Sequence, residues 1–261
     1  MKDSDLFPPR PGADVVFQSS DDVLFHLDPK HLELSAEAFP PVGKDTAIPD
    51  KPVPLVENSV ILELLFQFTS HKNQPDLEDL DFETLMELAE VAEKYVVYSA
   101  IRNCVMKMKD FIPAYTQQIF QFASKHNHEV LFCSIAPRFV SKPLADVAYT
   151  VPLNLYVPWT LYHEQWTEMI DKINKILLKY TYTGEHERGW QSSMCWVRDT
   201  IINEPLELGN FLKLFKLCEY RSCTSKCCSH FVSWRQEMID HISAMRDFKS
   251  FVREYKSQKS G

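Results

Sequence analysis

The most constraining feature of this sequence is the position at which its apolar periodicity changes. Short runs rich in β-branched and aromatic residues, the pattern of β-strands, occur at 14–18, 23–27 and 53–56. After residue 57 the apolar residues recur at the spacing of amphipathic helices. We therefore expect an α+β protein that is predominantly α-helical, with one small three-stranded sheet near the N-terminus covered by helices.

Turn and capping residues predict the elements around this sheet. A short polar stretch separates the first two runs, which is the spacing of a hairpin. Asp28 is a suitable N-cap and Pro29 suits the first helical position, so a short helix should follow. Its apolar contacts are expected from Leu32 and Leu34. Pro54 restricts the third strand to a sheet edge or to a position whose N–H is not needed.

The helices that follow are predicted from faces of apolar residues. The first has the spacing i, i+1, i+4, i+5, i+8, formed by Val60, Ile61, Leu64, Leu65 and Phe68. The second is capped by Asp81, and helical patterns continue at 101–108, 115–124 and 128–139. Six residues of the front part are predicted to be buried: Phe17, Phe25, Leu32, Leu64, Leu85 and Ala92.

The rear of the chain is also helical in pattern. A loop rich in proline and small residues at 143–158 precedes an amphipathic stretch from Tyr162 to Tyr180, and further helices are expected near 190–202, 206–220 and 229–250. The predicted organisation is a disordered tail at 1–12, a sheet-containing domain at 13–108, a helical extension at 109–145, a C-terminal helical domain at 146–255 and a tail at 256–261.

Charge and composition exclude several classes of function. Residues 1–110 hold 21 acidic and 10 basic side chains, a net charge of −11, whereas the rest of the chain has a net charge of +3 and no basic run. Nucleic-acid binding is not expected, because phosphate neutralisation needs clustered Lys and Arg. The apolar runs are too short to cross a bilayer, and the acidic N-terminus has no signal-peptide core. Together with seven cysteines, an odd number, this predicts a cytoplasmic and/or nuclear protein with reduced thiols.

No motif of an enzyme occurs in the sequence. The six glycines form no phosphate-binding loop, and neither a Gly-x-Ser-x-Gly elbow nor a His-Glu-x-x-His helix is present. We therefore expect no catalytic residues, no cofactor-binding residues and no enzymatic activity.

One cluster has the residue types of a zinc site. Cys218, Cys223, Cys227 and His230 lie within thirteen residues, together with Cys228, and zinc prefers thiolate and imidazole ligands. Their spacing lacks a Cys-x-x-Cys knuckle, and free cysteine is commonly buried. Buried or boundary thiols without metal are the preferred interpretation, and a zinc site is the alternative.

The order of the predicted elements resembles a BTB/POZ domain. The residues concerned are DVVF at 14–17, the run VLFHLDPKHLELSAEAF at 23–39, VPLVE at 53–57 and LAEVAEKYVVYSAIRNCVMKM at 88–108. The segment at 113–137 is similar to the BACK-like helical extension that often follows such domains. The runs QPDLEDLDFETLMELAEVAEKY and VPWTLYHEQW are similar to a large group of BTB proteins of mushroom-forming fungi.

This resemblance implies a non-enzymatic protein–protein interaction module or adaptor. Its partners would be proteins, including itself as a homodimer, and the residues of the interaction surface stay unknown at this stage. Two alternatives are a substrate adaptor that binds a cullin ubiquitin-ligase scaffold, and a zinc-supported structural or transcription-associated regulator resting on the cysteine cluster.

The cysteine cluster leads to the first testable prediction. We expect the purified chain to contain far less than one zinc ion per molecule, because Cys218, Cys223, Cys227 and His230 are not expected to converge on one point. Elemental analysis of the protein, before and after dialysis against a chelator, measures this directly. Stoichiometric zinc that survives dialysis would contradict the preferred interpretation and favour the zinc-supported regulator.

Overall fold

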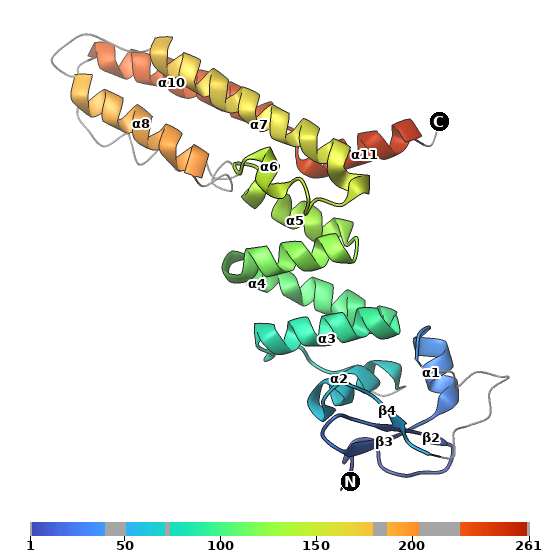
Figure 1. Cartoon of the computed structure of the whole chain (residues 1–261). Coiled ribbons are helices and arrows are strands. Elements are labelled where there is room, and N and C mark those ends of the chain that lie inside the picture. The colour runs from blue at the N-terminus through green and yellow to red at the C-terminus, as the bar shows by residue number, and fades with distance from the viewer. Residues whose placement is uncertain (1, 40–50, 71–73, 180–186, 204–224, 260–261) are drawn as a thin grey trace. The chain divides into compact units, whose positions relative to one another are not determined.

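A computed structural model describes residues 2–39, 51–70, 74–179, 187–203 and 225–259 (Figure 1). For residues 113, 187–193 and 225–231 it describes the backbone alone. The chain divides into two compact units, Met1–Tyr115 and Thr116–Gly261, which are described separately below. The protein is predominantly helical with one small sheet, as predicted, and among the described helices none is long and apolar enough to cross a membrane.

The first unit contains the sheet and the helices that follow it. Its strands are β1 (Lys2–Asp3), β2 (Val15–Gln18), β3 (Val23–Leu27) and β4 (Val53–Pro54). Its helices are α1 (Pro29–Ser35), α2 (Ser59–Thr69), α3 (Phe82–Tyr95) and the first part of α4 (Tyr98–Lys125), which is interrupted by non-helical backbone at Tyr115.

The sheet has four strands in the order β1-β3-β2-β4, rather than the three that the sequence predicts. Strands β2 and β3 form the predicted antiparallel hairpin, in which Phe17 lies opposite Phe25, and Asp22 in its turn has a positive φ of 65°. Strand β4 pairs parallel to β2 and β1 pairs parallel to β3, so these two short strands form the edges. The prediction that Pro54 restricts its strand to an edge is confirmed.

The prediction of a disordered tail at 1–12 is wrong for the described residues. Lys2 and Asp3 form β1, and Phe7 is buried against Phe25 and Phe66. Pairing of β1 with β3 and the aromatic anchor Phe7 order this segment.

The helix N-termini follow the predicted capping. The Asp28 carboxylate accepts a hydrogen bond from the Lys30 backbone N–H at the start of α1, and the Asp81 carboxylate accepts one from Thr84 at the start of α3. In α2 the cap is Asn58, whose side chain accepts from the Ile61 N–H.

The core of the first unit is built on α2 and the inner face of the sheet. The ring of Phe66 lies within 6.0 Å, centroid to centroid, of the rings of Phe7, Phe17 and Phe25. Of the six residues predicted to be buried, five are confirmed: Phe17, Phe25, Leu32, Leu85 and Ala92. Leu64 is only half-buried, and Leu34, predicted to pack with Leu32, is exposed.

The predicted buried face of α2 is displaced by one residue. Ile61, Leu62 and Leu65 are fully buried, whereas Val60 is exposed. The spacing i, i+1, i+4, i+5, i+8 holds when counted from Ile61 instead of Val60. Because this helix is apolar at nearly every position from 60 to 66, periodicity permitted both registers, and packing of Phe66 onto the sheet selects one of them.

The second unit is entirely helical in its described residues. It contains the end of α4, then α5 (Glu129–Phe139), α6 (Leu144–Val147), α7 (Leu153–Lys179), α8 (Glu187–Asn203), α10 (Ser225–Ser243) and α11 (Phe248–Lys259). Helix α7 packs against α8, α10 and α11. Its core is aromatic, with Trp159 in contact with Phe132, Tyr162 and Phe248.

Several predicted boundaries in this unit are wrong. The predicted loop at 143–158 contains α6 and the first turns of α7, with Pro158 inside the helix. The predicted tail at 256–261 is helical to Lys259. The predicted helix at 206–220 lies outside the described residues. The division at residues 108 and 145 stays a prediction.

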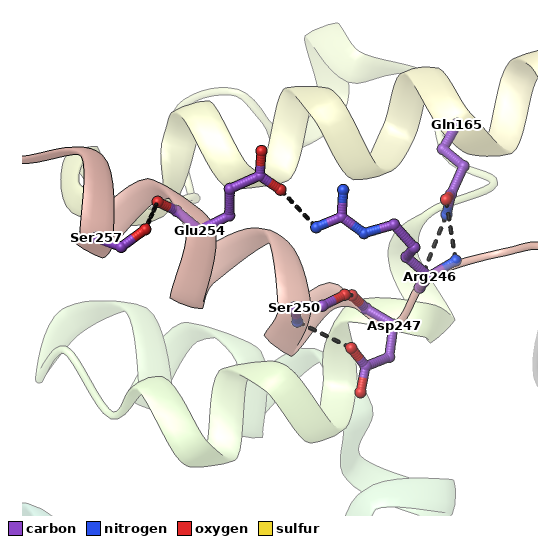
Figure 2. Close-up of polar contacts among 6 residues, drawn as sticks. All are labelled: Gln165, Arg246, Asp247, Ser250, Glu254 and Ser257. Atoms are coloured by element: carbon purple, nitrogen blue, oxygen red, sulfur yellow. Dashed lines mark hydrogen bonds and ion pairs between the residues drawn. The ribbon is translucent and has the colours of Figure 1, made fainter.

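The predicted helix at 229–250 is two helices, α10 and α11, and a polar corner fixes the break between them (Figure 2). The Gln165 side chain on α7 donates to the Arg246 backbone oxygen and accepts from the Arg246 N–H, both at 3.0 Å. The Asp247 carboxylate then accepts from the Ser250 N–H at 2.8 Å and caps α11. Hydrogen bonding from the Ser250 side chain and backbone holds the pKa of Asp247 below its usual value.

Two neighbouring leucines of α2 test the corrected register. Leu65→Ala should lower the free energy of unfolding by about 2–5 kcal/mol, because Leu65 is fully buried. Leu64→Ala should lower it by less, because the Leu64 side chain is only partly buried. Urea unfolding of both full-length variants, followed by circular dichroism, gives the two values. Equal decreases in the free energy of unfolding, or a larger decrease for Leu64→Ala, would contradict the assignment of Leu65 to the buried face of α2.

Candidate interaction surface

A buried carboxylate fixes the segment between β4 and α2. Glu57 is only 6% exposed. Its Oε1 accepts a hydrogen bond from Lys94 Nζ at 2.6 Å, and its Oε2 accepts one from the Tyr95 hydroxyl at 2.9 Å. Both donors come from the last turn of α3. The segment is thereby tied to α3 by a charge-assisted pair.

The electrostatics of this cluster favour the charged pair. Partial burial acts to lower the pKa of Lys94, but hydrogen bonds and charge from Glu57 and Tyr95 outweigh it, so that pKa is raised. Burial, with a smaller contribution from Glu57, raises the pKa of the Tyr95 hydroxyl. Tyr95 also stacks on Phe39, with ring centroids 4.4 Å apart. The cluster therefore attaches the segment after β4 to the end of α3.

The hairpin turn holds the same segment from the other side. The Asp21 carboxylate accepts hydrogen bonds from the Ser59 N–H at 2.7 Å and the Ser59 hydroxyl at 2.6 Å. The hydroxyl bond is the main reason that the pKa of Asp21 lies below its usual value. The Ser20 N–H donates to the Glu57 backbone oxygen at 2.9 Å. The start of α2 is thus fixed by residues nearly forty positions earlier in the chain.

Strained backbone follows Lys94 and Tyr95, the two hydrogen-bond donors to Glu57. Val96, directly after Tyr95, caps α3 in the left-handed conformation with φ 54° and ψ 53°. That conformation is unfavourable for a β-branched residue by roughly 1–2 kcal/mol. The Val96 N–H donates to Ala92 and Glu93, and Val97 beside it is fully buried. Packing therefore maintains a sharp turn that places α4 after α3.

Apolar side chains are exposed directly after the edge strand β4 and in the first turn of α2. Val56 is 79% exposed and Val60 is 61% exposed, while Leu55 between Pro54 and Val56 points into the core. Pro54 is also exposed and belongs to the edge strand β4. We call Pro54, Val56 and Val60 the β4 surface. Exposed apolar side chains near the edge strand of a sheet are a common feature of protein–protein contact surfaces.

A groove lies elsewhere on the first unit, between the loop before α3 and the first part of α4. Its volume is about 370 Å³, and it is lined by Pro75, Asp76, Leu77, Glu78, Asn103, Met106, Lys107 and Asp110. We call it the α4 groove. Met106 on its wall is 58% exposed, and Leu77 is buried. Asn103 donates to the Gln74 side chain at 3.3 Å, which links the two walls.

The second unit has one exposed apolar row of its own. Leu153, Val157 and Leu161 recur at i, i+4 and i+8 along α7, and Tyr149 precedes them. Such a row covers one helix face. Because residues 143–158 were predicted to form a loop, this row was not predicted from the sequence.

The candidate zinc ligands are not placed by the structure. Cys218 and Cys223 lie outside the described residues, and the side chains of Cys227 and His230 are not described. Among the described residues, no group of three or more His, Cys, Asp or Glu side chains could hold a metal ion. Cys104 on α4 is buried, and burial raises the pKa of its thiol to about 12.

Sequence reasoning did not single out the residues that build the β4 surface. The predicted third strand ends at Val56, one residue before Glu57, and Asp21 lies in the polar stretch between the first two predicted strands. One signal was available, because Glu57 is a lone carboxylate between the apolar run at 53–56 and the helix that begins at Ser59. Its partners on α3 lie 37 and 38 residues away, which spacing rules cannot anticipate.

Comparisons of the chain with protein-family models, with curated proteins and with solved structures give no match. The proposals that follow therefore rest on the contacts described above and on the resemblance seen in the sequence.

The buried thiol of Cys104 leads to a prediction about alkaline stability. The pKa of Cys104 is raised from 9.0 in the unfolded chain to about 12 in the folded one. Above pH 9 the thiol ionises only in the unfolded state, so the stability it contributes is complete below pH 9 and is lost between pH 9 and 12. Between pH 9 and 12, the free energy of unfolding should therefore fall less for the Cys104→Ala variant than for the native chain.

Urea unfolding at a series of pH values measures the difference in free energy of unfolding between the native chain and the variant. Contributions from ionisable groups that both proteins share cancel in this difference. Cys195→Ala, the same substitution at an exposed thiol, is the matched control variant. A difference between native chain and Cys104→Ala that does not change with pH would contradict the burial of this thiol.

Proposed function

We propose that this protein is a non-enzymatic protein–protein interaction module, with a BTB/POZ-like first unit that self-associates through the β4 surface. The observation that carries the proposal is the exposure of two valines that flank the buried Glu57 in the sequence, Val56 after the edge strand β4 and Val60 in the first turn of α2. Apolar side chains that a rigid segment exposes gain free energy when a partner covers them, at small cost in conformational entropy.

The element order supports the BTB/POZ part of this proposal. A hairpin, a short helix, a third strand and then paired helices follow one another in the first unit. These are the elements on which the sequence resemblance was based. The additional strand β1 lies outside that pattern, and the third strand, β4, is only two residues long.

Geometry favours side-chain packing over strand addition at this surface. Strand β4 contains only two residues, and Pro54 has no N–H to donate to an added strand. A two-fold dimer would instead place Val56 and Val60 against the same residues of a second copy, since such an interface is self-complementary. A specific interface of this kind buries upward of roughly 1,000 Å², so neighbouring side chains must contribute.

Charge makes a distinctive contribution to this proposed dimer. The first unit has a net charge of −11, so two copies repel one another at low ionic strength. Salt screens that repulsion and leaves the apolar contact intact. Self-association should therefore strengthen as the salt concentration rises.

Light scattering of the full-length protein at micromolar concentration tests the proposal. The native chain should have the mass of a dimer, and Val60→Asp should shift it to a monomer, because a buried unpaired carboxylate costs several kcal/mol. Leu34→Asp is the matched control. Leu34 is also exposed, at 78%, but it lies near the opposite end of α2, where Ser35 donates to the Thr69 backbone oxygen.

Leu34→Asp should leave the dimer mass unchanged. A monomer mass for the native chain at all salt concentrations would refute self-association and leave only other proteins as partners. Equal effects of the two aspartate variants would refute the assignment to the β4 surface.

A further inference from the structure

The α4 groove combines an apolar lining with an uneven charge distribution. Leu77 and Met106, with Pro75, supply its apolar atoms from opposite walls. Asp76, Glu78 and Asp110 place three carboxylates around them. Lys107 is the one cation among the described lining residues. The groove is therefore apolar in part and negatively charged at its rim.

Lys107 does not neutralise this rim. Its ammonium lies 3.2 Å from an Asp110 carboxylate oxygen and 5.9 Å from the centroid of the Phe111 ring. Its side chain is largely buried along α4. Asp76 uses one carboxylate oxygen to accept from the Glu78 N–H at 2.8 Å, which fixes the loop but leaves its charge in place. The net charge of the lining stays negative.

We propose that the α4 groove binds an arginine side chain presented by a partner protein. An arginine has an apolar stem that would lie between Leu77 and Met106, and a planar guanidinium that pairs with two carboxylates at once. The exposed Met106 thioether suits such a contact, because methionine adapts its shape to an incoming side chain.

Charge complementarity selects this occupant over an acidic or purely apolar one. The groove lies on a unit with a net charge of −11, and residues 76–83 of its loop and the following turn contain five acidic side chains and no basic one. A basic segment would be attracted before contact and paired after it. A volume of about 370 Å³ is also within the range of pockets that enclose a side chain or small ligand.

This inference rests on the proposed function, because it names the chemistry of a protein partner. It concerns a different surface from the one proposed for self-association, so each can fail alone. The dimer is tested by the mass in light scattering, and the groove is tested by a small probe that does not depend on that mass.

The probe is N-acetyl-arginine methylamide, and its control is the citrulline analogue, which has nearly the same shape but no charge. The full-length protein is labelled with ¹³C at the methionine methyl groups, and the Met106 signal is identified from its absence in Met106→Leu. Arginine should shift the Met106 signal saturably, and citrulline should not. Met108, which is fully buried on the same helix, is an internal reference that should not move.

Two charge-matched variants complete the test. Asp110→Asn should raise the dissociation constant of the arginine probe about tenfold, the equivalent of losing one charge-assisted hydrogen bond. Asp14→Asn removes the same charge from an exposed site on the hairpin side of the unit and should leave the constant unchanged. Unshifted Met108 and native circular dichroism show that each variant is folded.

Three results would overturn the inference: no saturable shift with arginine, an equal shift with citrulline, or an equal weakening by Asp14→Asn. Loss of the dimer mass on Asp110→Asn would also overturn it as stated, because the arginine would then belong to a second copy of this chain.

Discussion

The buried carboxylate of Glu57 ties the segment between β4 and α2 to the last turn of α3. A carboxylate removed from water is unfavourable unless it is paired and hydrogen-bonded. Glu57 is paired with Lys94 and hydrogen-bonded to Tyr95, which lie 37 and 38 residues later in the sequence, on α3. The short segment after β4 can therefore occupy only one position, against the end of α3.

Several features follow from that position. Leu55 turns into the core and Val56 turns outward, because the backbone between β4 and α2 is fixed at both ends. The last turn of α3, held by the same pair, continues into the left-handed Val96 and sets the start of α4. The β4 surface and the wall of the α4 groove thus both depend on α3, although no residue is shared between them.

The sequence was sufficient for local features and insufficient for those set by distant partners. The hairpin, the caps at Asp28 and Asp81, and the edge position of Pro54 depend on neighbouring residues and are confirmed. The predicted buried face of α2 was wrong by one residue. A helix that is apolar on most sides has two equivalent candidate faces, and the packing of Phe66 against the sheet selects one of them. The corner at Arg246, where one predicted helix is two, depends on Gln165 far earlier in the chain.

The β4 surface as an association surface is the central claim, and amide hydrogen exchange at increasing protein concentration tests it most directly. The peptide covering residues 53–60 should exchange more slowly at high than at low micromolar concentration, as a second copy covers it. The exposed row of α7 at 153–161 serves as an internal reference and should exchange at one rate throughout. Exchange at 53–60 that does not depend on concentration, or slowing confined to α7, would contradict the claim.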